Sequence, residues 1–238
     1  AFAAGLTKAE ADSVTAAILK DRADTEAWLK ADPSSYLATI HRVDFEDRAT
    51  LVVGRAADAD VRIDDPAIAP HHLRVTVAGD SFDVAAIDPE ATFTVKDQIL
   101  KAAKLPPSAV GVGRYRIRLS HQRYPALIVF DPQSPRFKEY RGIKYYPVDL
   151  ACRFVVPLIA NPNPDTTTIL STRGNVRKAI RAGWFEVRIA EKTQRLEVNR
   201  LLEPGVGESD ISLYFQDGTT GKETYDVGRY VNPERRPD

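Results

Sequence analysis

From Tyr36 onward, the chain is a succession of short segments in which apolar and polar residues alternate, separated by Gly, Asp and Pro. Alternation with a period of two is the pattern of a β-strand that buries one face, whereas a helix repeats every 3.6 residues. In the segment 114–119, Arg114, Arg116 and Arg118 share one face, and apolar side chains share the other. We interpret this basic row as a solvated strand face rather than an anion site. The pattern predicts a mainly β, antiparallel fold.

The predicted strands cover most of the chain beyond residue 49. Two of them, 184–189 and 195–198, flank a polar turn and predict a hairpin, with Phe185, Val187 and Ile189 in the core. The proline-broken stretch 161–165 predicts a loop. The other expected strands are 50–53, 61–63, 73–77, 82–84, 91–99, 114–119, 127–130, 144–146, 153–159, 166–172 and 211–215.

One helix precedes the β-rich region. Thr7 and Glu10 have the spacing of a capping box, in which each side chain binds the other residue's free backbone amide. An apolar stripe of helical period follows, and Pro33 disfavours helical geometry at the residue before it. The sequence therefore predicts a helix from Thr7 to Lys30, packed on its own domain.

The charge balance excludes several classes of function. Lys and Arg together number 33, as do Asp and Glu, so the formal net charge is zero at pH 7. Neutralising phosphates needs a basic excess, so we expect no nucleic-acid partner. No apolar run approaches the roughly 20 residues of a spanning helix, so we expect a soluble protein with no membrane span.

The numbers of cysteine and methionine residues bear on the cellular compartment and on the N-terminus. A single cysteine excludes an internal disulfide and leaves the compartment open. No methionine occurs, so we expect a processed or trimmed N-terminus. We favour the cytoplasm, with a removed export signal as the alternative. Cys152 lies in an apolar, strand-like run, which predicts a buried structural thiol rather than a nucleophile.

The sharpest local signal is Gly54-Arg55 followed by the run Ile68-Ala69-Pro70-His71-His72. It resembles the forkhead-associated domain, a β-sandwich in which a Gly-Arg turn and a later Ser-x-x-His hold a phosphothreonine. The resemblance implies that Arg55 grips the phosphate and that His72 is structural. Ala69 replaces the serine, and the later Asn-Gly element is absent from 87–95. We interpret the site as a degenerate phosphate site on a phosphate-blind scaffold; a phosphopeptide reader using Arg55 is the alternative.

A metal or cofactor is not expected. His71 and His72 are adjacent, so along a strand their side chains point to opposite faces. The sequence around them holds no further cluster of Cys or His ligands.

Two later segments are similar to a bacterial and archaeal family known as domain of unknown function 1684. The segment 137–149 carries Arg-Gly-Ile-Lys-Tyr-Tyr-Pro-Val-Asp, and 214–230 ends in Thr-Tyr-Asp-Val-Gly-Arg-Tyr. With the Ala-Pro-x-His run, the resemblance covers about 36–230. The family pattern continues into a further tail beyond the Gly-Arg-Tyr motif, so we expect the second domain to be truncated at Asp238.

The segment 217–229 concentrates polar side chains around a tight turn. One interpretation is a satisfied polar network that fixes the loop. The other is a ligand pocket in which Arg229 binds an anion while Asp217 or Asp149 orients it or titrates. The candidate ligand-binding residues are Tyr145, Asp149, Asp217, Thr224, Tyr225 and Arg229.

The sequence thus predicts three parts: an N-terminal helix (1–35), a forkhead-associated-like sandwich (36–122) and a second antiparallel β domain (123–238). It has no nucleophile elbow, phosphate-cradling loop, zinc-protease motif or dinucleotide fingerprint. We expect a non-enzymatic binding or interaction module whose partner is a small polar or anionic ligand or a protein. The alternative is a hydrolase-like enzyme for a small molecule, built around Asp149, Asp217, Tyr225 and Arg229.

Overall fold

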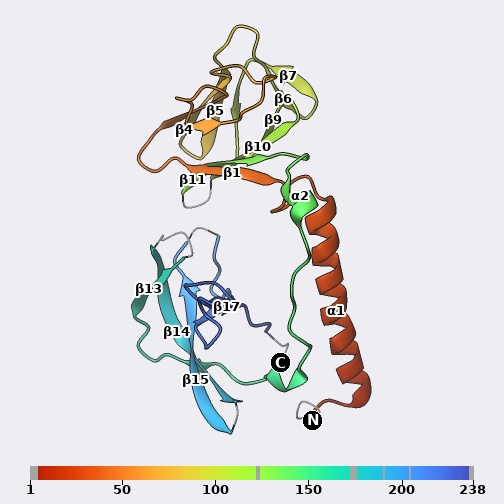
Figure 1. Cartoon of the computed structure of the whole chain (residues 1–238). Coiled ribbons are helices and arrows are strands. Elements are labelled where there is room, and N and C mark those ends of the chain that lie inside the picture. The colour runs from red at the N-terminus through yellow and green to blue at the C-terminus, as the bar shows by residue number, and fades with distance from the viewer. Residues whose placement is uncertain (1–4, 122–123, 172–175, 190, 204, 236–238) are drawn as a thin grey trace. The chain divides into compact units, whose positions relative to one another are not determined.

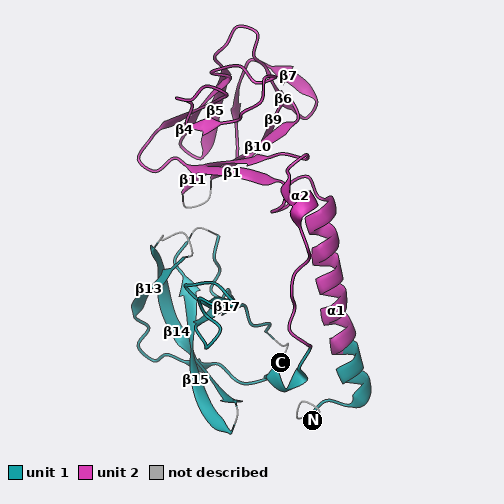
Figure 2. Ribbon diagram, viewed as in Figure 1, with its two compact units in different colours: residues 1–13, 148–238 teal, residues 14–147 magenta. Residues whose placement is uncertain are grey.

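The computed structural model describes residues 5–121, 124–171, 176–189, 191–203 and 205–235. The chain divides into two compact units (Figure 2). One contains residues 14–147, and the other contains residues 1–13 and 148–238. Apart from one long helix and two short helical turns, the described elements are strands (Figure 1), which confirms the mainly β fold.

Helix α1 spans Lys8–Ala31, as expected. The capping box forms: the Thr7 amide donates to the Glu10 carboxylate (2.7 Å), and the Glu10 amide donates to the Thr7 hydroxyl (3.3 Å). After the last turn, the Asp32 carboxylate accepts the Ser34 amide (2.7 Å) and closes the exit loop around Pro33. Within the described residues, no helix is both long enough and apolar enough to cross a membrane.

The 14–147 unit contains a β-sandwich. Its first sheet has the order β1-β11-β10-β9-β6-β7, and its second has the order β3-β2-β4-β5-β8. Buried side chains from both sheets, Phe82 and Ile117 among them, form one hydrophobic core. The strands are β1 (Thr39–Asp44), β2 (Thr50–Gly54), β3 (Val61–Arg62), β4 (Leu73–Ala78), β5 (Ser81–Ala86), β6 (Phe93–Val95), β7 (Gln98–Leu100), β8 (Ala102–Leu105), β9 (Ser108–Val112), β10 (Tyr115–His121) and β11 (Pro125–Phe130).

The alternation in β10 is confirmed, with one correction. Arg116 and Arg118 are exposed, and the side chains between and beside them are buried. Arg114, expected on the same face, instead precedes the strand, beside Gly113 with its positive φ of 56°, and pairs with two carboxylates. The segment 91–99, expected as one strand, is the β6–β7 hairpin, because Lys96 and Asp97 both adopt positive φ angles and turn the chain.

Strand β11 completes the first sheet. It pairs with β10 along one side and with β1 along the other, both antiparallel. The sequence predicts a second domain that begins at residue 123, ahead of this strand. The compact unit includes β11, which contributes Leu127 and Val129 to the sandwich core, and it ends at Pro147.

The unit that contains residues 148–238 is built on one antiparallel sheet. Its order is β12-β14-β15-β16-β17, with β13 also paired to β14. Strand β12 approaches β14 closely at Gly183, where a Cβ would lie 2.2 Å from the Ile159 carbonyl oxygen. The strands are β12 (Ile159–Ala160), β13 (Thr166–Leu170), β14 (Val176–Ile189), β15 (Lys192–Leu201), β16 (Ser212–Phe215) and β17 (Arg229–Val231).

The expected hairpin is confirmed as β14–β15, paired from Ala179↔Leu201 to Ile189↔Lys192. Val187 is buried, but Phe185 is only half-buried. The prediction for Ile189 is wrong: it is 45% exposed, because it lies beside the hairpin turn at the end of the paired region.

Along the chain, the segment from β11 to β12 has little regular structure. Helix α2 spans Arg136–Glu139, and a 3-10 turn, η1, spans Leu150–Cys152. The extended residues 140–147 between them, here called the strap, run alongside α1 (Figure 1); 144–146 is not a strand. The prediction for Cys152 is also wrong, since its thiol is exposed where η1 interrupts the apolar run.

Candidate functional site

The Gly54-Arg55 turn packs directly against the loop that precedes β4. A Cβ at Gly54 would lie 2.0 Å from the Pro70 carbonyl oxygen, so the close approach requires glycine. Just beyond it, the Arg55 amide donates to the Ala69 carbonyl and the Ala56 amide to the Pro70 carbonyl, both over 3.1 Å. These bonds hold Arg55 at the rim of the loop, with its side chain exposed.

His72 fastens the same loop from inside the sandwich. The Ala69 amide donates to its Nδ1 (3.1 Å), so this nitrogen carries no proton. The other ring nitrogen, Nε2, lies 2.9 Å from the Thr92 carbonyl oxygen and donates to it. The ring is buried and both of its nitrogens are hydrogen-bonded within the sandwich, which supports the structural role expected for His72. His71 points elsewhere and contacts Asp58 (2.9 Å).

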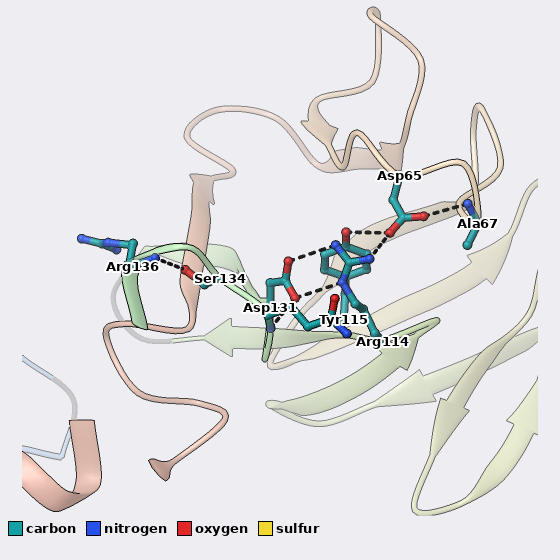
Figure 3. Close-up of polar contacts among 8 residues, drawn as sticks. Asp65, Ala67, Arg114, Tyr115, Asp131, Ser134 and Arg136 are labelled. Carbon is teal, nitrogen blue, oxygen red and sulfur yellow. Dashed lines mark hydrogen bonds and ion pairs between the residues drawn. The ribbon is translucent and has the colours of Figure 1, made fainter. Parts of the chain in front are cut away.

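A network of charged side chains lies behind this loop (Figure 3). The Arg114 guanidinium contacts Asp65 (2.5 Å) and binds both oxygens of Asp131 (3.0 and 3.2 Å). The Tyr115 hydroxyl donates to Asp65 (2.9 Å), and the Ala67 amide donates to its other oxygen (2.8 Å). Because both carboxylates are largely buried, Arg114 neutralises charges that would otherwise be costly in the fold.

The network shifts the ionisation of its members. Hydrogen bonds from the Ala67 amide and the Tyr115 hydroxyl hold the pKa of Asp65 below its ordinary value. Burial, reinforced by the bond to Asp65, raises the pKa of Tyr115 to about 12. Asp65 is thus held as a carboxylate, and the loop that begins there is tied to the start of β10 and the end of β11.

The loop forms one wall of a surface hollow of about 300 Å³, here called the Arg55 hollow. A second wall comes from the turn after β5, which contributes Asp88 and Glu90. The complete lining is Arg55, Pro66, Ala67, Ile68, Ala69, Pro70, His72, Asp88, Glu90 and Ala91. Both residues of the expected degenerate phosphate site, Arg55 and His72, therefore border one concavity.

The structure joins three of the expected C-terminal site residues. Arg229 forms an ion pair with Asp217. The Thr219 amide (2.9 Å) and hydroxyl (2.6 Å) also donate to Asp217, and the Thr219 hydroxyl lies 3.2 Å from that of Thr224. The bonds from Thr219, followed by the charge of Arg229, lower the pKa of Asp217. The cluster is a hydrogen-bonded network around the turn.

The other expected residues, Tyr145, Asp149 and Tyr225, are not part of this network. Asp149 caps η1, accepting the Ala151 amide (2.9 Å), and the Tyr225 side chain is 70% exposed. Within the described part of the chain, neither forms a hydrogen bond or ion pair with Asp217 or Arg229. Tyr145 lies on the strap, where the Arg22 guanidinium stacks over its ring at 4.7 Å.

Sequence reasoning missed Asp65 and Asp131, which surround Arg114. A local signal does exist, because each is next to a proline and accepts a backbone amide two residues later, as aspartates in turns often do. Nothing in the sequence indicates that Arg114 bridges residues 49 positions before and 17 positions after it. As for metals, the described ranges contain no group of three or more His, Cys, Asp or Glu able to hold an ion.

Comparison with known proteins finds a family for each of two parts of the chain. The segment 138–238 matches the family described as protein of unknown function DUF1684. Residues 51–107 match the FHA domain, the forkhead-associated sandwich. The DUF1684 match begins at residue 138, so it covers less than the 36–230 range expected from the motifs; of the earlier part, the FHA match covers residues 51–107. No curated protein matches the chain.

Three solved structures show the same kind of local likeness. The FhaA FHA domain, complexed with the intracellular domain of Rv3910, has 17% identity and a TM-score of 0.26 over 34% of this chain and 79% of its own. An FHA structure from a study of phosphothreonine-dependent interactions also has 17% identity and a TM-score of 0.26, over 34% and 75%. Mycobacterium tuberculosis EmbR, in complex with a low-affinity phosphopeptide, has 12% identity and a TM-score of 0.27, over 50% of this chain and 31% of its own.

Proposed function

We propose that this protein is a non-enzymatic interaction module whose FHA sandwich binds a segment of a protein partner at the Arg55 hollow, without requiring phosphothreonine. The hollow lies at the loops that join the strands, where a β-sandwich commonly carries its binding residues. Arg55 remains exposed there and has no hydrogen-bond or ion-pair partner for its side chain among the described residues.

The proposal depends on the lack of free hydrogen-bond donors at Ala69. Its side chain has no hydroxyl, and its backbone amide already donates to His72. A phosphate at this position would therefore find Arg55, but neither a hydroxyl nor a free amide at residue 69. Each missing hydrogen bond to a charged group is worth roughly 1.5–3 kcal/mol, enough to remove useful affinity for a phosphothreonine.

The test is an array of phosphothreonine peptides and their unphosphorylated counterparts, probed with the whole chain. We expect each phosphorylated peptide to bind no more tightly than its unphosphorylated counterpart. The same equality should hold for Arg55→Ala. Sub-micromolar binding of a phosphorylated peptide that disappears in Arg55→Ala would overturn the proposal and establish a phosphopeptide reader.

In the C-terminal unit, the residues expected to bind a ligand are better explained as groups that stabilise a turn. Arg229 is engaged by Asp217, and its Nε is buried without an acceptor among the described residues. Asp217 already neutralises the guanidinium, so a ligand anion would gain less from binding there. We infer that Asp217, Thr224 and Arg229 fix the turn, and that a small-anion site or an enzyme centre including Asp149 and Tyr225 is the weaker alternative.

A further inference from the structure

We infer that the Arg55 hollow selects a partner segment carrying a lysine or arginine, whose cationic group meets Glu90 and Asp88. This inference rests on the proposed function and adds the chemistry of the partner. It follows from three properties of the hollow: which hydrogen-bonding groups remain free, which charges line it, and what its walls are made of.

Backbone amides are the usual means of holding an anion in a loop, and most of those that line the hollow already donate to acceptors inside the module. The Arg55 amide donates to Ala69, and the His72 amide donates to Val53. On the opposite wall, the Glu90 amide donates to the Asp88 carboxylate (3.0 Å) and the Ala91 amide to the Asp88 carbonyl (3.0 Å). The amides of Ala67, Ile68 and Ala69 are used by Asp65 and His72, and Pro66 and Pro70 have none.

The side-chain groups of the hollow that lack a hydrogen-bond partner among the described residues include carboxylate oxygens, which favour a cationic ligand. The Glu90 carboxylate is exposed and has no hydrogen-bond or ion-pair partner within the described ranges, and one oxygen of Asp88 is equally unbonded. Lys101 contacts this wall at the Pro89 carbonyl (2.5 Å), which anchors the turn without pairing either carboxylate. The lining carries two carboxylates, Asp88 and Glu90, and one guanidinium, Arg55, a balance that repels a phosphate dianion and attracts an ammonium or guanidinium.

The walls suit the stem of a long basic side chain. Pro66, Ala67, Ala69 and Pro70 line the side opposite Asp88 and Glu90, whereas the Ile68 side chain is buried in the core. Lys and Arg pack their methylene stems along such apolar surface while the charged head reaches polar groups. Arg55, at the rim, is then available to a backbone carbonyl or an acidic residue of the same segment.

The test begins with selection of a random 12-residue peptide display library on the full chain, which samples basic, acidic and apolar segments alike. We expect selected peptides to contain Lys or Arg and to lose about tenfold in affinity when that residue is replaced by Met, as measured by calorimetry. Glu90→Gln combined with Asp88→Asn should cause a similar loss, because Asn at 88 keeps an oxygen for the Glu90 amide. Asp80→Asn is the matched control, since it removes a carboxylate at the far end of β4.

The possible outcomes separate the inference from the function on which it rests. One outcome is that selected peptides lose affinity when Gly54→Ala forces the turn away from Pro70, yet contain no basic residue or bind Glu90→Gln normally. Such peptides overturn the inference and leave the proposed function standing. Peptides unaffected by Gly54→Ala, Arg55→Ala and the carboxylate variants bind elsewhere and overturn both. Equal losses in Asp80→Asn and in the hollow variants show a general charge effect and overturn the inference.

Discussion

The Glu26 carboxylate of helix α1 accepts a hydrogen bond from the Tyr140 hydroxyl over 2.9 Å. The same oxygen accepts the Ile143 amide over 2.7 Å, so one helical carboxylate binds two points of the strap. Gly142, between them, has a φ of +90°, a backbone conformation that other residues rarely adopt. The Arg-Gly-Ile part of the DUF1684 motif thus has a structural reason here: it seats the chain on Glu26.

We predict that this contact makes stability depend on pH in the acidic range. The Ile143 amide, with the Tyr140 hydroxyl and Lys30, lowers the pKa of Glu26 below its ordinary value of 4.5. A carboxyl whose pKa is lowered on folding stabilises the fold fully above its unfolded pKa and loses that effect as pH falls through the folded value. Thermal melts should therefore show Glu26→Gln less stable than the native chain at pH 7, with the difference vanishing below the folded pKa.

The matched control for this measurement is Glu139→Gln, which removes a carboxylate from the preceding helix α2 that forms no hydrogen bond to the strap among the described residues. Its melting temperature should follow that of the native chain at every pH. A gap between Glu26→Gln and the native chain that persists unchanged at pH 3 would show that the loss comes from packing and not from the charged hydrogen bonds.

A second prediction concerns the alkaline range. Tyr115 has a pKa of about 12, above the ordinary value of 10.0. A tyrosine whose pKa is raised on folding contributes stability that is complete below about pH 10 and is lost as pH rises towards 12. Denaturant melts of the native chain should show stability falling over this interval, and Tyr115→Phe should fall less steeply. Tyr115→Phe should also cost about 1–3 kcal/mol at pH 7, because Asp65 loses a buried donor.

Local patterns in the sequence were sufficient to predict the capping box, the β14–β15 hairpin and the alternation in β10. Each depends on residues close together in the chain, where the period and turn chemistry fix the geometry. The Gly-Arg and Ala-Pro-x-His motifs similarly identified the FHA sandwich, and Arg55 and His72 do border one hollow.

Contacts between distant segments were not predictable from those patterns. Arg114 appeared to be one of three equivalent arginines, and only the pairing of β10 with β11 brings Asp131 to it. Glu26 and Tyr140 are separated by 114 positions, and no periodicity links them. Cys152 has strand-like neighbours, but Asp149 caps a 3-10 turn there and exposes the thiol.

The third prediction tests the structural interpretation of the C-terminal cluster. Arg229→Met keeps much of the side chain's stem and removes its charge, so the turn before β17 should lose its ion pair with Asp217. Hydrogen exchange should become faster in 212–231. Gly228→Ala should have a larger effect, since a Cβ would lie 2.5 Å from the Phe215 carbonyl oxygen at a φ of +104°. Unchanged exchange in Arg229→Met, together with loss of binding to a metabolite found by thermal-shift screening, would favour the ligand site.

The last prediction concerns the register of β14, which decides which side chains this sheet buries. Val187 is 4% exposed, whereas Ile189, on the same face two residues later, is 45% exposed beside the hairpin turn. Val187→Ala should cost about 2 kcal/mol, because it removes buried methyl groups and leaves a cavity. Ile189→Ala removes more carbon atoms but should cost less than about 0.5 kcal/mol, as is usual at exposed positions. Denaturant melts of the two variants measure this order directly. A slip of one residue would turn both side chains to the opposite face of the sheet, so equal losses, or a larger loss in Ile189→Ala, would contradict the register observed here.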